Sequence, residues 1–260
     1  MPRRSFAPVL TLSLMLGACV SGGGAEPSTG SNAPVGVNVP DVGGGRASGD
    51  IEGEPLLPEG VDVVAVPLER YVPMWDEPEA PGAAFALDTR NPLGELAPML
   101  IADARLANGN AWFEVYLPLR PNGTTAWVRE RDVRLRERDE RIEVDLSDRV
   151  LRRFVDGRLV DRLRVGVGTP QTPTGTGTFY VWVKVPYEDP DQPYGIMALG
   201  LSGFSPVLSD WPGEGRMAVH GTPYASDRGR AVSHGCVRVY NEDMRALLDV
   251  PLGTPVVISE

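Results

Sequence analysis

From Val61 to its C-terminus the chain alternates between short apolar runs and turn signals. Runs of four to eight residues rich in branched and aromatic side chains, bounded by turn residues, are typical of β-strands. Candidate strands cover residues 61–66, 96–102, 112–117, 125–129, 133–136, 141–146, 150–155, 158–167, 178–185 and 254–258. Only residues 241–250 place apolar side chains at helical spacing. The pattern therefore predicts a mainly β fold with one short helix.

We expect two folded units in this part of the chain, residues 60–136 and residues 139–260. Six arginines and five acidic residues lie between Arg129 and Arg141. Nearly balanced charge of this kind is typical of a solvated surface or a domain joint. We place the boundary near Arg138.

The first of these units carries an aromatic strand pair. Residues 112–116 read Trp-Phe-Glu-Val-Tyr, and residues 125–128 read Thr-Ala-Trp-Val. The pair resembles the closing half of a bacterial SH3-like barrel, in which a W-x-x-V strand leads through a hairpin into a G-W-V strand; here Ala126 replaces the glycine. The resemblance covers about residues 60–136 and implies a small barrel. Its aromatic side chains would form the barrel core, or would line a groove that binds peptide.

The N-terminal residues 1–19 have the pattern of a secretory signal. Arg3 and Arg4 precede an apolar run, residues 6–16, that is too short to span a membrane as a helix. The run leads into Leu-Gly-Ala and then Cys19, which resembles the lipobox of bacterial lipoproteins. That resemblance implies cleavage before Cys19 and a diacylglycerol on its thiol. An ordinary signal peptide, with Cys19 incidental, is the alternative.

Residues 20–58 have the composition of a flexible tether. Gly, Ser and Pro make up about half of the segment, so it cannot bury enough apolar surface to offset the entropy of ordering. As a flexible coil it would reach on the order of 35 Å. We expect it to hold the folded units away from a membrane.

The composition excludes two classes of function. The formal net charge of −10 argues against a nucleic-acid partner, which requires clustered Lys and Arg. Two histidines and one cysteine beyond Cys19 cannot supply the four ligands of a structural zinc site. We therefore expect no metal and no cofactor.

The second unit concentrates the reactive side chains. Cys236 follows Ser233, His234 and Gly235, and His220 lies sixteen residues before it. A cysteine attacks as its thiolate, so it needs a nearby base, and histidine has a pKa near neutrality. The backbone N–H groups of Gly235 and Cys236 could face the developing oxyanion.

These residues resemble the signature of the L,D-transpeptidases of the YkuD type. The signature is a histidine, a gap, and then Ser/Thr-His-Gly-Cys followed by an apolar residue and Arg or Asn. Residues 220–222 (His-Gly-Thr) and 233–238 (Ser-His-Gly-Cys-Val-Arg) match it, and residues 172–175 (Thr-Pro-Thr-Gly) match a turn of the same family. The resemblance spans about residues 139–260 and implies a β-sandwich-like catalytic domain.

The family implies a role for each matching residue. Cys236 would attack an acyl carbonyl, His220 would be its base, and the backbone carbonyl of Gly221 would orient the imidazole. The substrate would be a peptidoglycan tetrapeptide stem, from which terminal D-alanine is released. An amine of a neighbouring stem would accept the acyl group, which gives a 3→3 cross-link.

The other residues near the motif admit two interpretations. We expect His234 to hold loops through hydrogen bonds, and Ser233 either to support the thiol or to cap a turn. Arg238 would pair with a substrate carboxylate or brace the loop. Tyr194 and Trp211 would either line a substrate-binding pocket or serve ordinary packing. The residues expected to form a solvated lip are Asp227, Arg228 and Arg230, and the alternative is that their cations help to bind a stem carboxylate.

Three other functions compete with the transpeptidase. NlpC/P60 endopeptidases also combine a cysteine with an SH3-like partner, but their cysteine precedes its histidine, and no histidine follows Cys236. An L,D-carboxypeptidase of the same fold would pass the acyl group to water. A third possibility is a non-catalytic, tethered wall-binding protein. For the transpeptidase we expect a monomeric lipoprotein, anchored outside the cytoplasm and facing the cell wall.

Overall fold

The computed structural model describes residues 55–209 and 213–260. The signal, Cys19, the tether up to Glu54 and Trp211 lie outside the described residues. Residues 51–260 form one compact unit. Within the part of the chain that is described, no helix is both long and apolar enough to cross a membrane.

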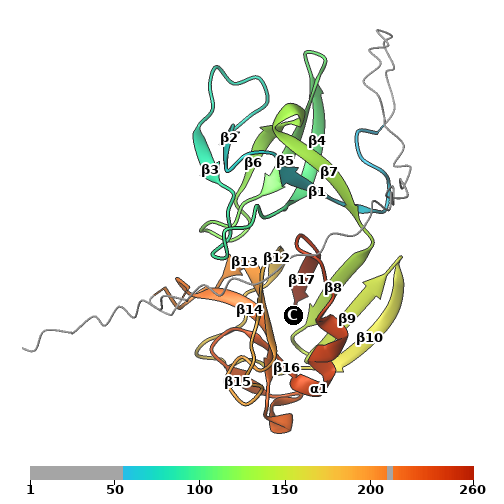
Figure 1. Cartoon of the computed structure of the whole chain (residues 1–260), viewed down its shortest axis with the longest axis vertical. Coiled ribbons are helices and arrows are strands. Elements are labelled where there is room, and N and C mark those ends of the chain that lie inside the picture. The colour runs from blue at the N-terminus through green and yellow to red at the C-terminus, as the bar shows by residue number, and fades with distance from the viewer. Residues whose placement is uncertain (1–54, 210–212) are drawn as a thin grey trace, which may run out of the picture. The chain divides into compact units, whose positions relative to one another are not determined.

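The first sheet has five strands in the order β6-β5-β4-β1-β7 (Figure 1). Its strands are β1 (Asp62–Pro67), β4 (Met99–Ala107), β5 (Asn110–Tyr116), β6 (Thr125–Arg129) and β7 (Val133–Arg138), with a 3-10 turn at Glu130–Asp132 before β7. A separate antiparallel pair consists of β2 (Tyr71–Met74) and β3 (Phe85–Asp88). The predicted hairpin of aromatic strands is present, because β5 pairs with β6. Identification of these strands as an SH3-like barrel stays a prediction.

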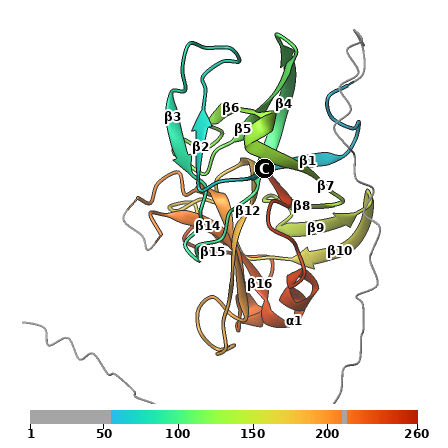
Figure 2. The same ribbon diagram turned by 45° about the horizontal axis from the view of Figure 1, so that its top comes forward.

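The second sheet has eight strands in the order β10-β9-β8-β17-β12-β13-β14-β16 (Figure 2). Its strands are β8 (Glu140–Asp145), β9 (Val150–Val155), β10 (Arg158–Arg164), β12 (Gly177–Pro186), β13 (Met197–Phe204), β14 (Arg216–Thr222), β16 (Val237–Tyr240) and β17 (Pro255–Ser259). A short parallel pair, β11 (Val167–Gly168) and β15 (Ala231–Ser233), lies outside this sheet. The mainly β expectation is confirmed.

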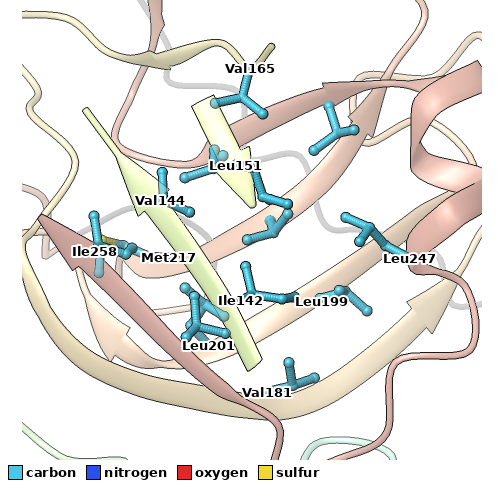
Figure 3. Packing of buried hydrophobic residues seen from close by; sticks show 14 of the residues in the cluster. Ile142, Val144, Leu151, Val165, Val181, Leu199, Leu201, Met217, Leu247 and Ile258 are labelled. Carbon is cyan, nitrogen blue, oxygen red and sulfur yellow. The ribbon is translucent and has the colours of Figure 1, made fainter. Parts of the chain in front are cut away.

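One hydrophobic core fills this second sheet. It draws buried side chains from seven of its eight strands; Ile142, Val181, Leu199, Met217 and Ile258 are among them and are all 0–2% exposed (Figure 3). Each fully buried aliphatic side chain of this size stabilises the fold by about 1.5–3 kcal/mol relative to an exposed one. The core holds β14 and β16 rigidly, and these are the strands that flank the candidate nucleophile.

The predicted helix over residues 241–250 is shorter than expected. It consists of α1 (Asn241–Met244) followed by a 3-10 turn (Arg245–Leu247). Met244 and Leu247 are both fully buried. A 3-10 helix places residues i and i+3 on one side, so the apolar spacing that suggested an α-helix is satisfied by the tighter turn as well.

The loop between β5 and β6 contacts the end of β13 through two side chains. Asn122 donates from Nδ2 to the carbonyl of Phe204 and accepts at Oδ1 from its N–H, both at 2.8 Å. Arg120 donates to the carbonyls of Ser205, Leu208 and Glu214 at 2.8–3.1 Å. The first sheet is thereby tied to the chain segment that follows β13.

Asn122→Ala should lower the free energy of unfolding. Two hydrogen bonds are lost, and each contributes about 0.5–1.5 kcal/mol, so the expected loss is about 1–3 kcal/mol. Urea unfolding measures it, with Arg131→Ala as the control because Arg131 is exposed. Equal stability of the two variants would show that the contact contributes nothing.

Candidate active site

Cys236 lies in the turn between β15 and β16, and β16 is the edge strand that pairs with β14. β14 and β16 are parallel, with Val219 opposite Val237 and His220 opposite Arg238. Because alternate residues of a strand point to the same face, His220 and Cys236 lie on one face of this strand pair. The structure therefore brings the two residues together that the sequence motif had placed sixteen positions apart.

The imidazole of His220 is held in one tautomer. His220 is 4% exposed, and its Nδ1 lies 2.6 Å from the carbonyl oxygen of Gly221. A carbonyl only accepts hydrogen bonds, so in the neutral ring the proton is on Nδ1 and Nε2 keeps its lone pair. The side of the ring that can accept a proton is thus Nε2.

Burial keeps both reactive groups uncharged at neutral pH. It lowers the pKa of His220 to about 4, with a smaller contribution from Arg238 in the same direction. Burial also raises the pKa of the Cys236 thiol, against the opposing effects of the Ala218 backbone N–H and Arg238. Desolvation penalises the charged form of each group. The pair in the free protein is therefore a neutral thiol and a neutral base.

The sulfur has a hydrogen-bond donor that sequence reasoning missed. The backbone N–H of Ala218 hydrogen-bonds to the Cys236 sulfur and lowers the pKa of the thiol. Cys236 as a residue is only partly buried, but desolvation is the main influence on its thiol. No sequence signal marks a backbone donor, because any residue at position 218 supplies one.

Ser233 caps the turn that carries Cys236. Its Oγ donates to the carbonyl of Cys236 at 2.5 Å and accepts from the N–H of Gly235 at 3.1 Å. The second bond uses the Gly235 N–H that we expected to face an oxyanion. Gly235 has φ of +117°, a conformation that L-residues rarely adopt, so glycine is required there for the turn itself.

The Thr172–Gly175 turn packs directly against this turn. The Oγ1 of Thr172 and the N–H of Thr169 both donate to the carbonyl of Ser233 at 3.1 Å. Gly168 donates from its N–H to Thr174 Oγ1 at 2.9 Å. The two motifs, about sixty residues apart in sequence, thus form one hydrogen-bonded unit.

Arg238 is paired within the protein. Its Nη1 lies 3.1 Å from Asp227 Oδ2, which also accepts from Thr222 Oγ1 at 3.0 Å. Of the two interpretations of Arg238, the structure shows a contact that braces the loop. The expected solvated lip is wrong for Asp227, which is 8% exposed because it compensates this arginine. Arg228 is also paired, with Asp243 at 2.7 Å.

Two further predicted residues, Tyr194 and His234, differ in their surroundings. Tyr194 contacts the imidazole of His220 edge-on, with ring centroids 5.0 Å apart, and stacks on Tyr187 at 5.9 Å. Tyr194 therefore lies against the candidate base, and its role as a pocket wall stays a prediction. His234 is exposed in the turn, and its role in holding loops stays a prediction. Among the described residues, no three His, Cys, Asp or Glu side chains form a group that could hold a metal ion.

Comparison with known families gives one match, which covers the second sheet. Residues 139–258 match the model of the L,D-transpeptidase catalytic domain, YkuD. The protein named "Putative L,D-transpeptidase YkuD" from Bacillus licheniformis is 36% identical over 120 residues, which are 46% of this chain and 65% of that protein. Its namesake from Bacillus subtilis is 31% identical over 119 residues, 45% of this chain and again 65% of that protein. The chain thus spans somewhat less than two thirds of the length of these relatives.

Solved structures give weaker overlaps. L,D-transpeptidase 3 from Mycobacterium tuberculosis is 18% identical, with a TM-score of 0.42 over 63% of this chain and 92% of that one. The catalytic domain of the E. faecium L,D-transpeptidase acylated by ertapenem is 26% identical, with a TM-score of 0.35 over 46% of this chain and 97% of that one. The residues that the family model matches include both His220 and Cys236. Residues 139–258 are therefore similar to the L,D-transpeptidase catalytic domains of the YkuD family, as both the family model and the curated relatives indicate.

Proposed function

We propose that this domain forms 3→3 cross-links between peptidoglycan stem peptides, with Cys236 as the nucleophile and His220 as its base. The observation that carries the proposal is the orientation of His220. Its Nδ1 is occupied by the Gly221 carbonyl, which leaves Nε2 to accept the thiol proton from the same face of the strand pair. A cysteine, a base and an orienting acceptor are the parts that acyl transfer requires.

The reaction has two acyl transfers. In the first, Nε2 of His220 takes the thiol proton, and the sulfur attacks the carbonyl carbon of the third stem residue. The tetrahedral intermediate collapses with cleavage of the peptide bond to D-alanine, whose amine takes the proton back from the imidazolium. In the second, an amine of a neighbouring stem attacks the thioester and the thiol is restored. One peptide bond is broken and one is formed, so no energy source is needed.

Backbone donors would stabilise the charges that develop. The Ala218 N–H faces the sulfur, and it would favour the thiolate as the proton leaves. The Gly235 N–H is engaged with Ser233, so the Cys236 N–H is the donor we assign to the oxyanion. A single donor of this kind contributes about 10²–10³ in rate.

Two other outcomes concern the same site. In a carboxypeptidase, water would take the place of the acceptor amine. In a passive wall-binding protein, no acyl group would be transferred at all. The oriented tautomer of His220 favours catalysis over passive binding, because binding alone does not require a free Nε2.

Mass spectrometry of purified muropeptides separates the three functions. Tetrapeptide monomers incubated with the protein should give 3→3 dimers and free D-alanine. Tripeptide monomers alone would indicate a carboxypeptidase, and unchanged muropeptides would contradict both enzymes. Cys236→Ala, which keeps the turn but not the thiol, is the matched control.

The remainder of the chain fits a protein that works at the cell wall. We propose that Cys19 is lipidated, that the tether spaces the folded unit from its membrane outside the cytoplasm, and that the protein acts as a monomer on stem peptides. The five-stranded sheet would then be the SH3-like domain next to the catalytic one.

The pH dependence of the acylation rate should show the low pKa that burial gives His220. The neutral imidazole is the active form, and its pKa is lowered to about 4. The rate should therefore rise as pH rises through about 4 and stay level towards pH 7. Stopped-flow acylation by a carbapenem measures this profile. A midpoint near 6.5, the ordinary value for histidine, would contradict it.

A further inference from the structure

The side chain of Asn241, which lies outside the sequence motif, holds the segment that carries Tyr194. The segment from Tyr187 to Ile196 connects β12 to β13, and it brings the ring of Tyr194 edge-on against His220. Asn241, the first residue of α1, donates from Nδ2 to the carbonyl of Pro190 at 2.7 Å. Its Oδ1 accepts from the N–H of Ile196 at 3.1 Å. Two points of the segment, one on each side of Tyr194, are thus tied to one amide.

Asn241 also lies against the residue that orients the imidazole. A Cβ on Gly221 would collide with Asn241 Oδ1 and would lie 2.9 Å from the Ile196 nitrogen. A Cβ on Gly195 would collide with Asn241 Oδ1 and with the backbone of Gly221. Gly195 has φ of +60°, so it adopts a conformation that suits glycine. The side chain of Asn241 therefore fills the narrow space between the Tyr194 segment and the backbone of Gly221.

The segment is braced within itself as well. Gln192 donates from Nε2 to the carbonyl of Gly195 at 2.6 Å and accepts at Oε1 from the N–H of Tyr194 at 3.1 Å. These bonds hold the turn in shape, but both partners lie inside the segment. The bonds from Asn241 are the ones that fasten the turn to the helix beside β16.

We propose that Asn241 is a positioning residue for the acylation chemistry, because it holds Tyr194 against His220 and keeps the imidazole out of water. The proposal rests on the proposed function, since it concerns the base of that reaction. Asn241 touches neither the thiol nor the base, and it acts through Tyr194 and Gly221.

The groups around His220 determine how its pKa should respond when Asn241 is replaced. Arg238 on β16 and Asp227, which ends a 3-10 turn before β15, act on the imidazole with opposite sign. Burial raises the pKa of the Cys236 thiol, so this neighbour adds no charge at neutral pH, and the ring of Tyr194 lies edge-on against the imidazole. The carboxylates of the segment itself are Glu188, Asp189 and Asp191, all exposed. Release of the segment would admit water, and the pKa of His220 would rise from about 4 towards its ordinary value.

Asn241→Ala in the mature full-length chain tests the proposal. Acylation by a carbapenem at pH 7 should slow by about tenfold to a hundredfold. The reason is that His220 is no longer held in the orientation the reaction needs once Tyr194 moves away from it. The acid limb of the pH profile should move upward, towards about 6.5. Glu242→Ala is the matched control, since its side chain is exposed at the next position of the same helix. Tyr194→Ala should reproduce both effects and should add little when combined with Asn241→Ala.

An NMR titration of His220 keeps this test independent of activity. His234→Gln leaves one histidine, so the imidazole signals of His220 can be followed directly. Asn241→Ser shortens the side chain without adding a charge, and serves if the alanine variant does not fold. A raised His220 pKa in either variant supports the proposal even if the chain transfers no stem peptide. A rate, pH profile and pKa equal to those of Glu242→Ala would overturn it.

Discussion

Cys236→Ala is expected to abolish D-alanine release and cross-linking. Alanine has no nucleophile, and the covalent intermediate cannot form without the sulfur. The loss should exceed that of any other single substitution in the domain. Release of D-alanine from a purified tetrapeptide, followed in a coupled assay, measures it.

Cys19→Ala is the matched control for that variant. It removes the chain's other thiol, so it tests whether the effect belongs to position 236. The detergent-solubilised Cys19→Ala protein should retain the wild-type rate. Residual turnover by Cys236→Ala above the uncatalysed rate would mean that another group is the nucleophile.

His220→Ala should slow acylation at pH 7 by roughly 10²–10⁴, the usual contribution of a general base. The thiol would then react only through the small fraction that ionises unaided. Burial raises the pKa of that thiol, so the rate of the variant should climb with pH well above neutrality. The wild-type rate, in contrast, should be level across that range. Pre-steady-state acylation between pH 5 and 10 shows the difference.

His234→Ala is the control for this second variant. The ring of His234 is exposed in the turn, and we expect it to hold loops rather than to move protons. Its loss should leave the shape of the pH profile unchanged. Two results would show that His220 is not the base. Either both histidine variants lose the pH-independent region of the acylation rate, or His220→Ala keeps it.

The sequence was sufficient to predict the mainly β fold and the YkuD-type domain that residues 139–258 match. The pairing of Cys236 with His220 could be inferred because both lie in a recognisable ordered pattern. Strand β13 was missed for a physical reason, since all eight of its residues are buried. A strand covered on both faces lacks the alternation that identifies half-buried strands.

The contacts between segments far apart in sequence could not be predicted. Asn241 meets Ile196 across 45 positions, and nothing in either local sequence indicates that approach. From the sequence, Arg238 could equally well bind a substrate carboxylate or brace the loop. The sequence does not show that the buried Asp227 faces it. The sequence alone leaves the Gly235 N–H available for an oxyanion. Its hydrogen bond to Ser233 depends on the geometry of the turn, which the sequence does not show.

The central claim, an acyl-enzyme on Cys236, is tested most directly by intact-protein mass spectrometry. The mature protein is mixed with a peptidoglycan tetrapeptide, without an acceptor, and is quenched in acid within its first turnover. The account predicts a mass increase equal to the tripeptide acyl group, located on the peptide that contains Cys236 and absent from Cys236→Ala. Release of D-alanine with no adduct on Cys236 at any quench time, or an adduct on another residue, would contradict it.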